Sequence, residues 1–450
     1  MMADSFSGSP TKISGGMNLL FSRSVWIKAL FTALAFTLCA IAVRFYWGYP
    51  RCRNDELNWI DIARTLDTGQ EWPVSGPSFV YVLRNMKEMT RMQYSELISG
   101  LGIVSVFFGS LLIILGYSRL KISKPGATLI ALALSSYFWA PLLEARPQQW
   151  GQIHVFVGSI CAWLWLHKRG GWLFFPVLIL ASFSHILSHA ILVFICATLA
   201  LADYFENRPM NRRHAILIAC LLLSLIVYVL PSGPYQTMLS DIEGTHLRRL
   251  LVAMPYLGAA ALMTVFAIVA LKPRLHWRSD WSNATRAYAL AHQNVICATL
   301  LVIFSTVISI QAWVLPPDSW LPYGGSVWTF VVFQSGNLVF ALLFVVGIFH
   351  FLRDIANLKI EASNARMLVW SLASFGMLGL ATLAASFFML NTNWLLRLIN
   401  YAILFAAPVA AITIGNSNTL RKFPWLYLLT IPLFIISICQ AIRPTELLSC

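Results

Sequence analysis

The chain has 450 residues, of which 58% are hydrophobic and 11% are charged, and its mean hydropathy is +0.71. A soluble domain carries roughly a quarter charged residues, so this composition excludes a water-soluble globular protein and predicts a surface that faces lipid. The eight cysteines show no CxxC or Cys/His ligand spacing, which argues against a structural zinc site.

Long apolar segments recur along the whole chain, and about 20 such residues suffice to cross the hydrocarbon core as a helix. The sequence predicts an all-α membrane protein with about thirteen spans and no separate soluble domain. Residues 1–23 are a cytoplasmic tail, 24–210 a first membrane module, and 211–450 a more variable set of C-terminal spans. The expected spans are 24–46, 98–118, 126–143, 151–167, 172–184, 187–204, 214–231, 249–272, 293–315, 327–350, 367–390, 397–416 and 423–441.

The distribution of charge predicts the orientation, because cytoplasmic loops carry an excess of Lys and Arg. With the N-terminus inside, the inner segments hold 20 of the 32 basic residues and 6 of the 18 acidic ones. The whole formal charge of +14 then lies on the inner side. The basic balance is therefore a topology signal, and no nucleic-acid partner is predicted.

The longest segment between spans is the loop 47–97, which this orientation places outside. Its first part, 54–68, repeats apolar residues at helical spacing, which predicts an amphipathic helix lying on the membrane surface. A turn at 72–77, rich in Pro and Gly, separates it from a second amphipathic helix over 78–96.

Two adjacent carboxylates, Asp55 and Glu56, stand at the start of the first of these helices. A carboxylate near the lipid surface can act as a general base on a hydroxyl, or hold a divalent cation against a phosphate. The alternative is that the pair only complements the dipole at the helix start.

The loop also resembles a known family. Its pattern is N-D-E-x-x-W-x-x-I-A-R-x-L over 54–66, followed by G-x-x-W-P-x-x-G-P over 69–77. This is similar to the first outer loop of the GT-C superfamily of integral-membrane glycosyltransferases, which includes the protein O-mannosyltransferase and lipid A aminoarabinose transferase families. The resemblance covers about the first 210 residues.

The resemblance implies a transferase that uses a polyprenyl-phosphate-linked sugar as donor. The acceptor would be a glycan, lipid or protein, and the active site would face the periplasm of a bacterial inner membrane. Asp55 matches the position of the catalytic base, with Glu56 beside it. The second acidic motif of metal-dependent members is reduced here to a single carboxylate, Glu144, which leaves a requirement for a divalent metal open.

Six further residues fall at the predicted outer ends of spans and are candidates for binding the donor phosphate or the sugar: Glu144, Arg146, His185, His189, Arg248 and Arg249. Each has a structural alternative. The arginines can reach lipid headgroups, or in one case pair with the neighbouring carboxylate. The histidines, spaced i and i+4, can bind a metal, a phosphate or a sugar, or can mark a helix junction. That junction lies within 172–204, where two short helices or one long tilted helix both fit.

A flippase or transporter for lipid-linked saccharides is the rival interpretation, because it would share the topology and the basic residues near the headgroups. The sequence has no GxxxxGK[ST] or GxGxxG motif, and no span holds a central charge of the kind that ion-coupled transporters use. The early acidic loop favours the enzyme.

Overall fold

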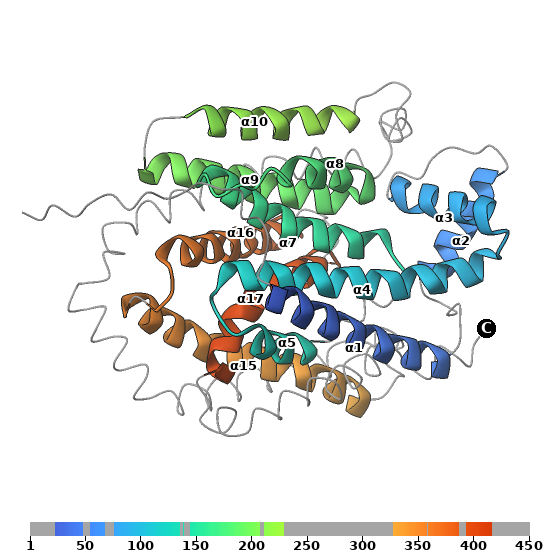
Figure 1. Ribbon diagram of the computed structural model, residues 1–450, viewed down its shortest axis with the longest axis horizontal. Coiled ribbons are helices and arrows are strands. Elements are labelled where there is room, and N and C mark those ends of the chain that lie inside the picture. Colours follow the sequence, from blue (N-terminus) through green and yellow to red (C-terminus); the bar gives the residue numbers. More distant parts are fainter. Residues whose placement is uncertain are drawn as a thin grey trace, which may run out of the picture.

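The computed structural model describes residues 23–47, 55–67, 76–135, 138, 145–207, 211–228, 327–357, 359–386 and 393–415, and these residues form helices and a few short turns (Figure 1). The helices are α1 Arg23–Trp47, α2 Asp55–Asp67, α3 Pro77–Thr90, α4 Tyr94–Leu120, α5 Pro125–Ala133, α7 Pro147–Leu166, α8 Phe174–Ser184, α9 Ile186–Asn207, α10 Arg212–Ser224 with a 3₁₀ turn at Leu225–Tyr228, α15 Val327–Ala356, α16 Ala362–Ser386 and α17 Asn393–Gly415.

Local sequence explains where several helices begin. Proline occupies the first turn of α3, α5 and α7, where its missing N–H costs nothing. The side chain of Asn211 caps α10 by accepting hydrogen bonds from the backbone N–H groups of Arg213 and His214. Helix α4 is followed by Lys121, whose φ of 52° places it in the left-handed conformation typical of helix C-termini.

Helix α7 occupies the middle of the bundle and packs against α4, α8 and α9 (Figure 1). Its Phe156 meets the rings of Tyr117 from α4 and Phe405 from α17 edge to face, with centroids 5.0 and 5.4 Å apart. The Tyr117 hydroxyl donates to the carbonyl oxygen of Leu404 at 2.7 Å. The C-terminal helix α17 is thereby fixed to the N-terminal helices.

Two glycines allow close helix contacts. A Cβ on Gly151 of α7 would lie 1.9 Å from the Oγ of Ser188 on α9. One on Gly347 of α15 would lie 2.2 Å from the carbonyl oxygen of Val409 on α17. Small residues at such crossings let membrane helices approach closely.

The bundle has two polar ends. One end, called the pocket end below, holds α2, α3, the C-terminal end of α1 and the starts of α4, α7, α9 and α17. At the opposite end Arg169, after α7, pairs with Glu361, before α16. Asp203 of α9 also meets His214 of α10 there, with an oxygen 3.0 Å from Nε2. The charge-based orientation places the loops 168–169 and 353–361 on the inner side, and the contact between Arg169 and Glu361 brings these two loops together at one end of the bundle.

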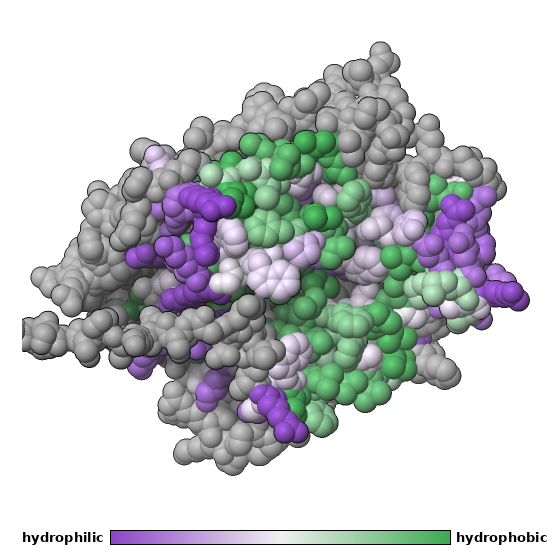
Figure 2. Space-filling model, turned by 45° about the horizontal axis from the view of Figure 1, so that its top comes forward, coloured by the Kyte–Doolittle hydropathy of each residue, from purple (hydrophilic) through white to green (hydrophobic). Residues whose placement is uncertain are grey.

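The protein is an integral membrane protein. Within the described residues six helical segments are long and apolar enough to cross a bilayer: Arg23–Ala42, Tyr94–Leu120, Ile186–Tyr204, Gly336–Ile355, Ser363–Thr382 and Arg397–Gly415. On the face drawn in Figure 2, apolar surface lies between two hydrophilic ends. The exposed apolar side chains of the described residues include Phe31 and Leu38 of α1. A lipid-facing surface accounts for such apolar exposure.

Several predicted elements are confirmed in outline. The helix predicted over 54–68 is present as α2, Asp55–Asp67. The helix expected over 78–96 is present as α3, which is shorter and ends at Thr90. The ambiguous segment 172–204 divides at His185 into two helices, as the first alternative expected. At about 1.5 Å per residue the 11-residue α8 is too short to span a bilayer alone, which corrects the span expected at 172–184.

The thirteen-span count is not established. Helix α5 has nine residues, so the span expected at 126–143 is seen only in its first part. The spans expected at 249–272, 293–315 and 423–441 lie outside the described residues.

Candidate functional site

A pocket of about 250 Å³ lies where four segments meet, at the end of the bundle that contains α2 and α3. Helix α2 and the start of α7 form two of its walls. The short break between α8 and α9 contributes a third, and α17 the fourth. Its lining is cationic, amide-bearing and aromatic: Asn58, Trp59, Ile62, Arg146, Pro147, Gln148, His185 and Arg397.

Two polar contacts hold the end of α2 to α3 and to the start of α4. Asp67 at the end of α2 accepts a hydrogen bond from the Lys87 ammonium at 2.7 Å and one from the Tyr94 hydroxyl at 2.9 Å. Partial burial acts to raise the pKa of Asp67, but these hydrogen bonds and the nearby positive charges outweigh it and lower the pKa overall. Asp67 therefore stays ionised at neutral pH.

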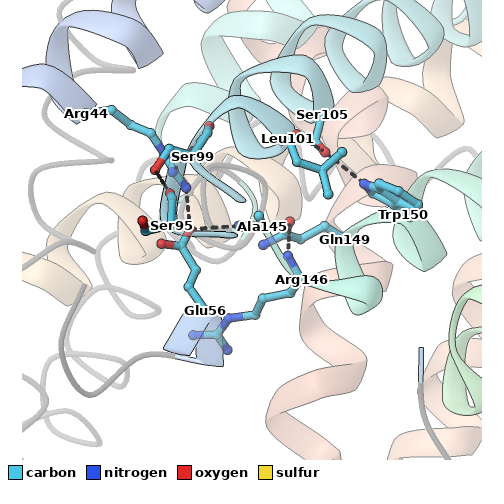
Figure 3. A network of polar contacts seen from close by, with 10 residues as sticks. All are labelled: Arg44, Glu56, Ser95, Ser99, Leu101, Ser105, Ala145, Arg146, Gln149 and Trp150. Carbon is cyan, nitrogen blue, oxygen red and sulfur yellow. Dashed lines mark hydrogen bonds and ion pairs between the residues drawn. The ribbon is translucent and has the colours of Figure 1, made fainter. Parts of the chain in front are cut away.

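Glu56 joins three parts of the chain at the first turn of α2 (Figure 3). Its fully buried carboxylate pairs with the guanidinium of Arg44, near the end of α1. The same Oε1 accepts the backbone N–H of Ala145 at 3.0 Å. Arg44 also donates to the carbonyl oxygen of Ser99 on α4 at 3.5 Å. Burial and these partners favour a structural role for Glu56 over contact with a substrate.

The residue next to Ala145 is Arg146, which caps α7 and lines the pocket. The Gln149 side chain accepts the Arg146 backbone N–H at 2.9 Å (Figure 3), which fixes this first turn. Glu56 therefore fixes the position of the backbone at Ala145, the residue immediately before Arg146. The sequence analysis expected Arg146 at the outer end of a span, on the side of the loop 47–97, and the contact between Ala145 and Glu56 brings it next to a helix of that loop.

His185 lines the pocket at the break between α8 and α9. The backbone N–H of Ser188 donates to His185 Nδ1 at 3.4 Å, so Nδ1 accepts and the ring proton of the neutral tautomer resides on Nε2. The Ser188 hydroxyl in turn bonds the Tyr401 hydroxyl at 2.6 Å. His185 is thus held as a hydrogen-bond donor at the pocket wall.

His189 is placed differently from its predicted partner. Both ring nitrogens bond hydroxyl groups, Nδ1 that of Tyr228 at 2.5 Å and Nε2 that of Ser224 at 2.9 Å. The residue does not line the pocket. Its contacts hold α9 to the end of α10, which supports the helix-junction alternative for this histidine.

Other candidates cannot be placed in the site. Asp55 begins α2, but its side chain lies outside the described residues, as do Glu144, Arg248 and Arg249. The sequence analysis missed Arg397, an arginine at the start of a predicted span. It also missed Asn58, Trp59 and Gln148, which the pocket brings together from α2 and α7.

Two guanidiniums, a histidine N–H and two side-chain amides suit an anion that carries further polar groups. Among the described residues no three His, Cys, Asp or Glu side chains form a cluster that could hold a metal ion. Comparison with protein-family models, curated proteins and solved structures found no match to this chain.

Proposed function

We propose that this protein is a membrane-embedded glycosyltransferase. It transfers a sugar from a polyprenyl-phosphate-linked donor to a hydroxyl group of a lipid-linked glycan, a surface polysaccharide or a protein. The pocket carries the proposal, because it combines Arg146 and Arg397 with hydrogen-bond donors at one end of an apolar bundle. A sugar donor whose lipid tail remains in the bilayer would present its phosphate at the end of the apolar bundle, where this pocket opens.

The chemistry follows from the groups that the pocket end provides. The guanidiniums hold the phosphate and offset the charge that grows on it as the glycosidic C–O bond breaks. Asp55, at the first residue of α2, takes the proton of the acceptor hydroxyl as its oxygen attacks the anomeric carbon. Direct attack inverts the configuration, and the polyprenyl phosphate leaves.

Glu56 has a supporting role in this proposal. Its carboxylate, engaged by Arg44 and the Ala145 amide, fixes the first turn of α2 against the segment that carries Arg146. The base and the phosphate-binding arginine then keep a constant separation. The pocket end faces the periplasm of a bacterial inner membrane, in keeping with the predicted orientation.

The test uses purified protein in lipid nanodiscs with a panel of polyprenyl-phosphate sugars and a hydroxyl acceptor. Asp55→Asn should lower transfer by about 10²–10⁴, because Asn caps a helix nearly as well as Asp but cannot take the proton. Arg397→Ala should weaken donor binding and raise KM. Arg64→Gln, which alters an exposed arginine on α2, is the matched control and should leave transfer unchanged.

Near-normal transfer by Asp55→Asn would refute the base assignment. The rival class has its own signature: wild-type protein that moves lipid-linked saccharide across proteoliposomes without forming a product is a flippase, and the enzyme proposal then fails.

A further inference from the structure

Trp59 is the one tryptophan, tyrosine or phenylalanine among the described residues that line the pocket. It projects from α2 and is partly exposed. Basic and amide groups from other elements line the same small space. Phosphate binding accounts for the basic and amide groups of the pocket but gives no role to the indole ring of Trp59.

Neighbouring rings hold the indole in place. Trp59 meets Phe79 of α3 edge to face at 5.7 Å between centroids, and Phe79 meets Trp150 of α7 at 5.2 Å. The Trp150 indole N–H donates to the Ser105 hydroxyl at 2.8 Å, which anchors the row of rings to α4 (Figure 3). Such edge-to-face pairs orient rings as well as bury them.

Gly76 adds a second restraint. It adopts φ of 76°, and a Cβ there would lie 2.4 Å from Cγ of Pro147 and 3.0 Å from Cη2 of Trp59. The chain therefore passes directly against the indole where α3 begins. The ring is packed on this side and has little freedom to turn away from the pocket.

The chemistry of a held indole beside two guanidiniums matches a sugar phosphate. One face of a pyranose presents C–H groups, which suit the electron-rich face of an aromatic ring. Its hydroxyls require amide partners such as Asn58 and Gln148, and its phosphate requires arginine. At about 250 Å³ the pocket is smaller than the roughly 300–1,000 Å³ of sites for drug-sized ligands, which favours one sugar unit.

We propose that Trp59 is the platform on which the sugar ring of the donor stacks, so that the pocket selects a single pyranose 1-phosphate unit. The inference deepens the proposed function, since it names the residue that recognises the transferred sugar. It predicts recognition of the sugar ring in the absence of any acceptor.

The test measures binding without transfer, as the thermal stabilisation of the nanodisc-embedded protein by graded concentrations of hexose 1-phosphate or of inorganic phosphate. Hexose 1-phosphate should bind the wild type more tightly than phosphate. Trp59→Leu should reduce that preference by roughly threefold to tenfold while phosphate binding is retained. Trp172→Leu, at an exposed tryptophan after α7, is the control and should keep the preference.

Trp59→Phe covers the case in which the leucine variant does not fold. It keeps a ring against Phe79 but offers less area, and its preference should fall between those of wild type and leucine. An unchanged preference in either folded variant, or no preference in the wild type, overturns the inference. Preference that depends on Trp59, in protein that shows no transfer, supports the inference and refutes the proposed enzyme.

Discussion

The buried pair of Arg44 and Glu56 makes the sharpest prediction about stability. The two side chains are 4% and 0% exposed and join α1 to α2. Removing one member of a buried pair costs about 3–5 kcal/mol, because the other charge stays buried without that partner. Glu56→Gln retains an oxygen that can accept the Ala145 N–H, so it isolates the loss of charge. Its free energy of unfolding should fall by that amount.

The double variant Arg44→Met with Glu56→Gln removes both charges and keeps the acceptor. Its stability should return close to that of the wild type, since replacing both members of a buried pair is often nearly neutral. Glu56→Leu should be worse than Glu56→Gln by about 1–3 kcal/mol, because the Ala145 N–H then loses its acceptor.

Unfolding free energies in mixed micelles with increasing SDS measure these differences. Arg64→Gln breaks an exposed pair with Asp61 on the same helix and should cost less than about 1 kcal/mol. If Glu56→Gln is no more destabilising than this control, the reasoning is refuted. The double variant also separates roles, because sugar transfer by the refolded pair mutant excludes Glu56 as a proton acceptor.

Two further predictions concern packing and pH. Gly151→Ala should destabilise the protein by about 1–3 kcal/mol, because the added methyl group would overlap Ser188. The control Gly100→Ala on α4 adds a methyl group that meets nothing within 4 Å, so it should be neutral or stabilising. Unfolding in detergent compares the stabilities of the two variants. The hydrogen bond from Arg169 lowers the pKa of Glu361, so the ion pair's contribution is complete above the ordinary value of 4.5 and is lost as the pH falls through the lowered pKa. Unfolding midpoints measured from pH 7 to pH 3 should fall less steeply in Arg169→Gln, and parallel curves would contradict this.

The sequence predicted the features that depend on local order. Apolar spacing alone indicated α2 within one residue of its ends, because a surface helix must turn its apolar side inward. The polar residues between Ser182 and His189 favoured two helices over one long tilted helix, and the structure divides the segment at His185. Both follow from neighbours along the chain.

The pocket itself could not be predicted in this way. Arg397 reaches it from the last described helix, and nothing in the sequence near Asn58 or Trp59 indicates that encounter. The sequence shows that Arg44 lies near the end of the first span and that Glu56 follows shortly after it. This proximity along the chain is the only sequence signal for their ion pair. Long-range contacts of this kind depend on how the helices pack, and one sequence carries no direct record of packing.

The anchoring of α17 bears on the choice between enzyme and flippase. Tyr117 holds its Leu404 carbonyl, Ser188 bonds its Tyr401 hydroxyl, and Gly347 brings α15 against the backbone of Val409. Arg397 therefore projects from a helix that α4, α9 and α15 each hold. A flippase must expose its site alternately to the two sides, which requires the helices around the site to move relative to one another. A transferase gains from a rigid site, because hydrogen-bond donors that are fixed around the leaving phosphate need not reorganise as the glycosidic bond breaks.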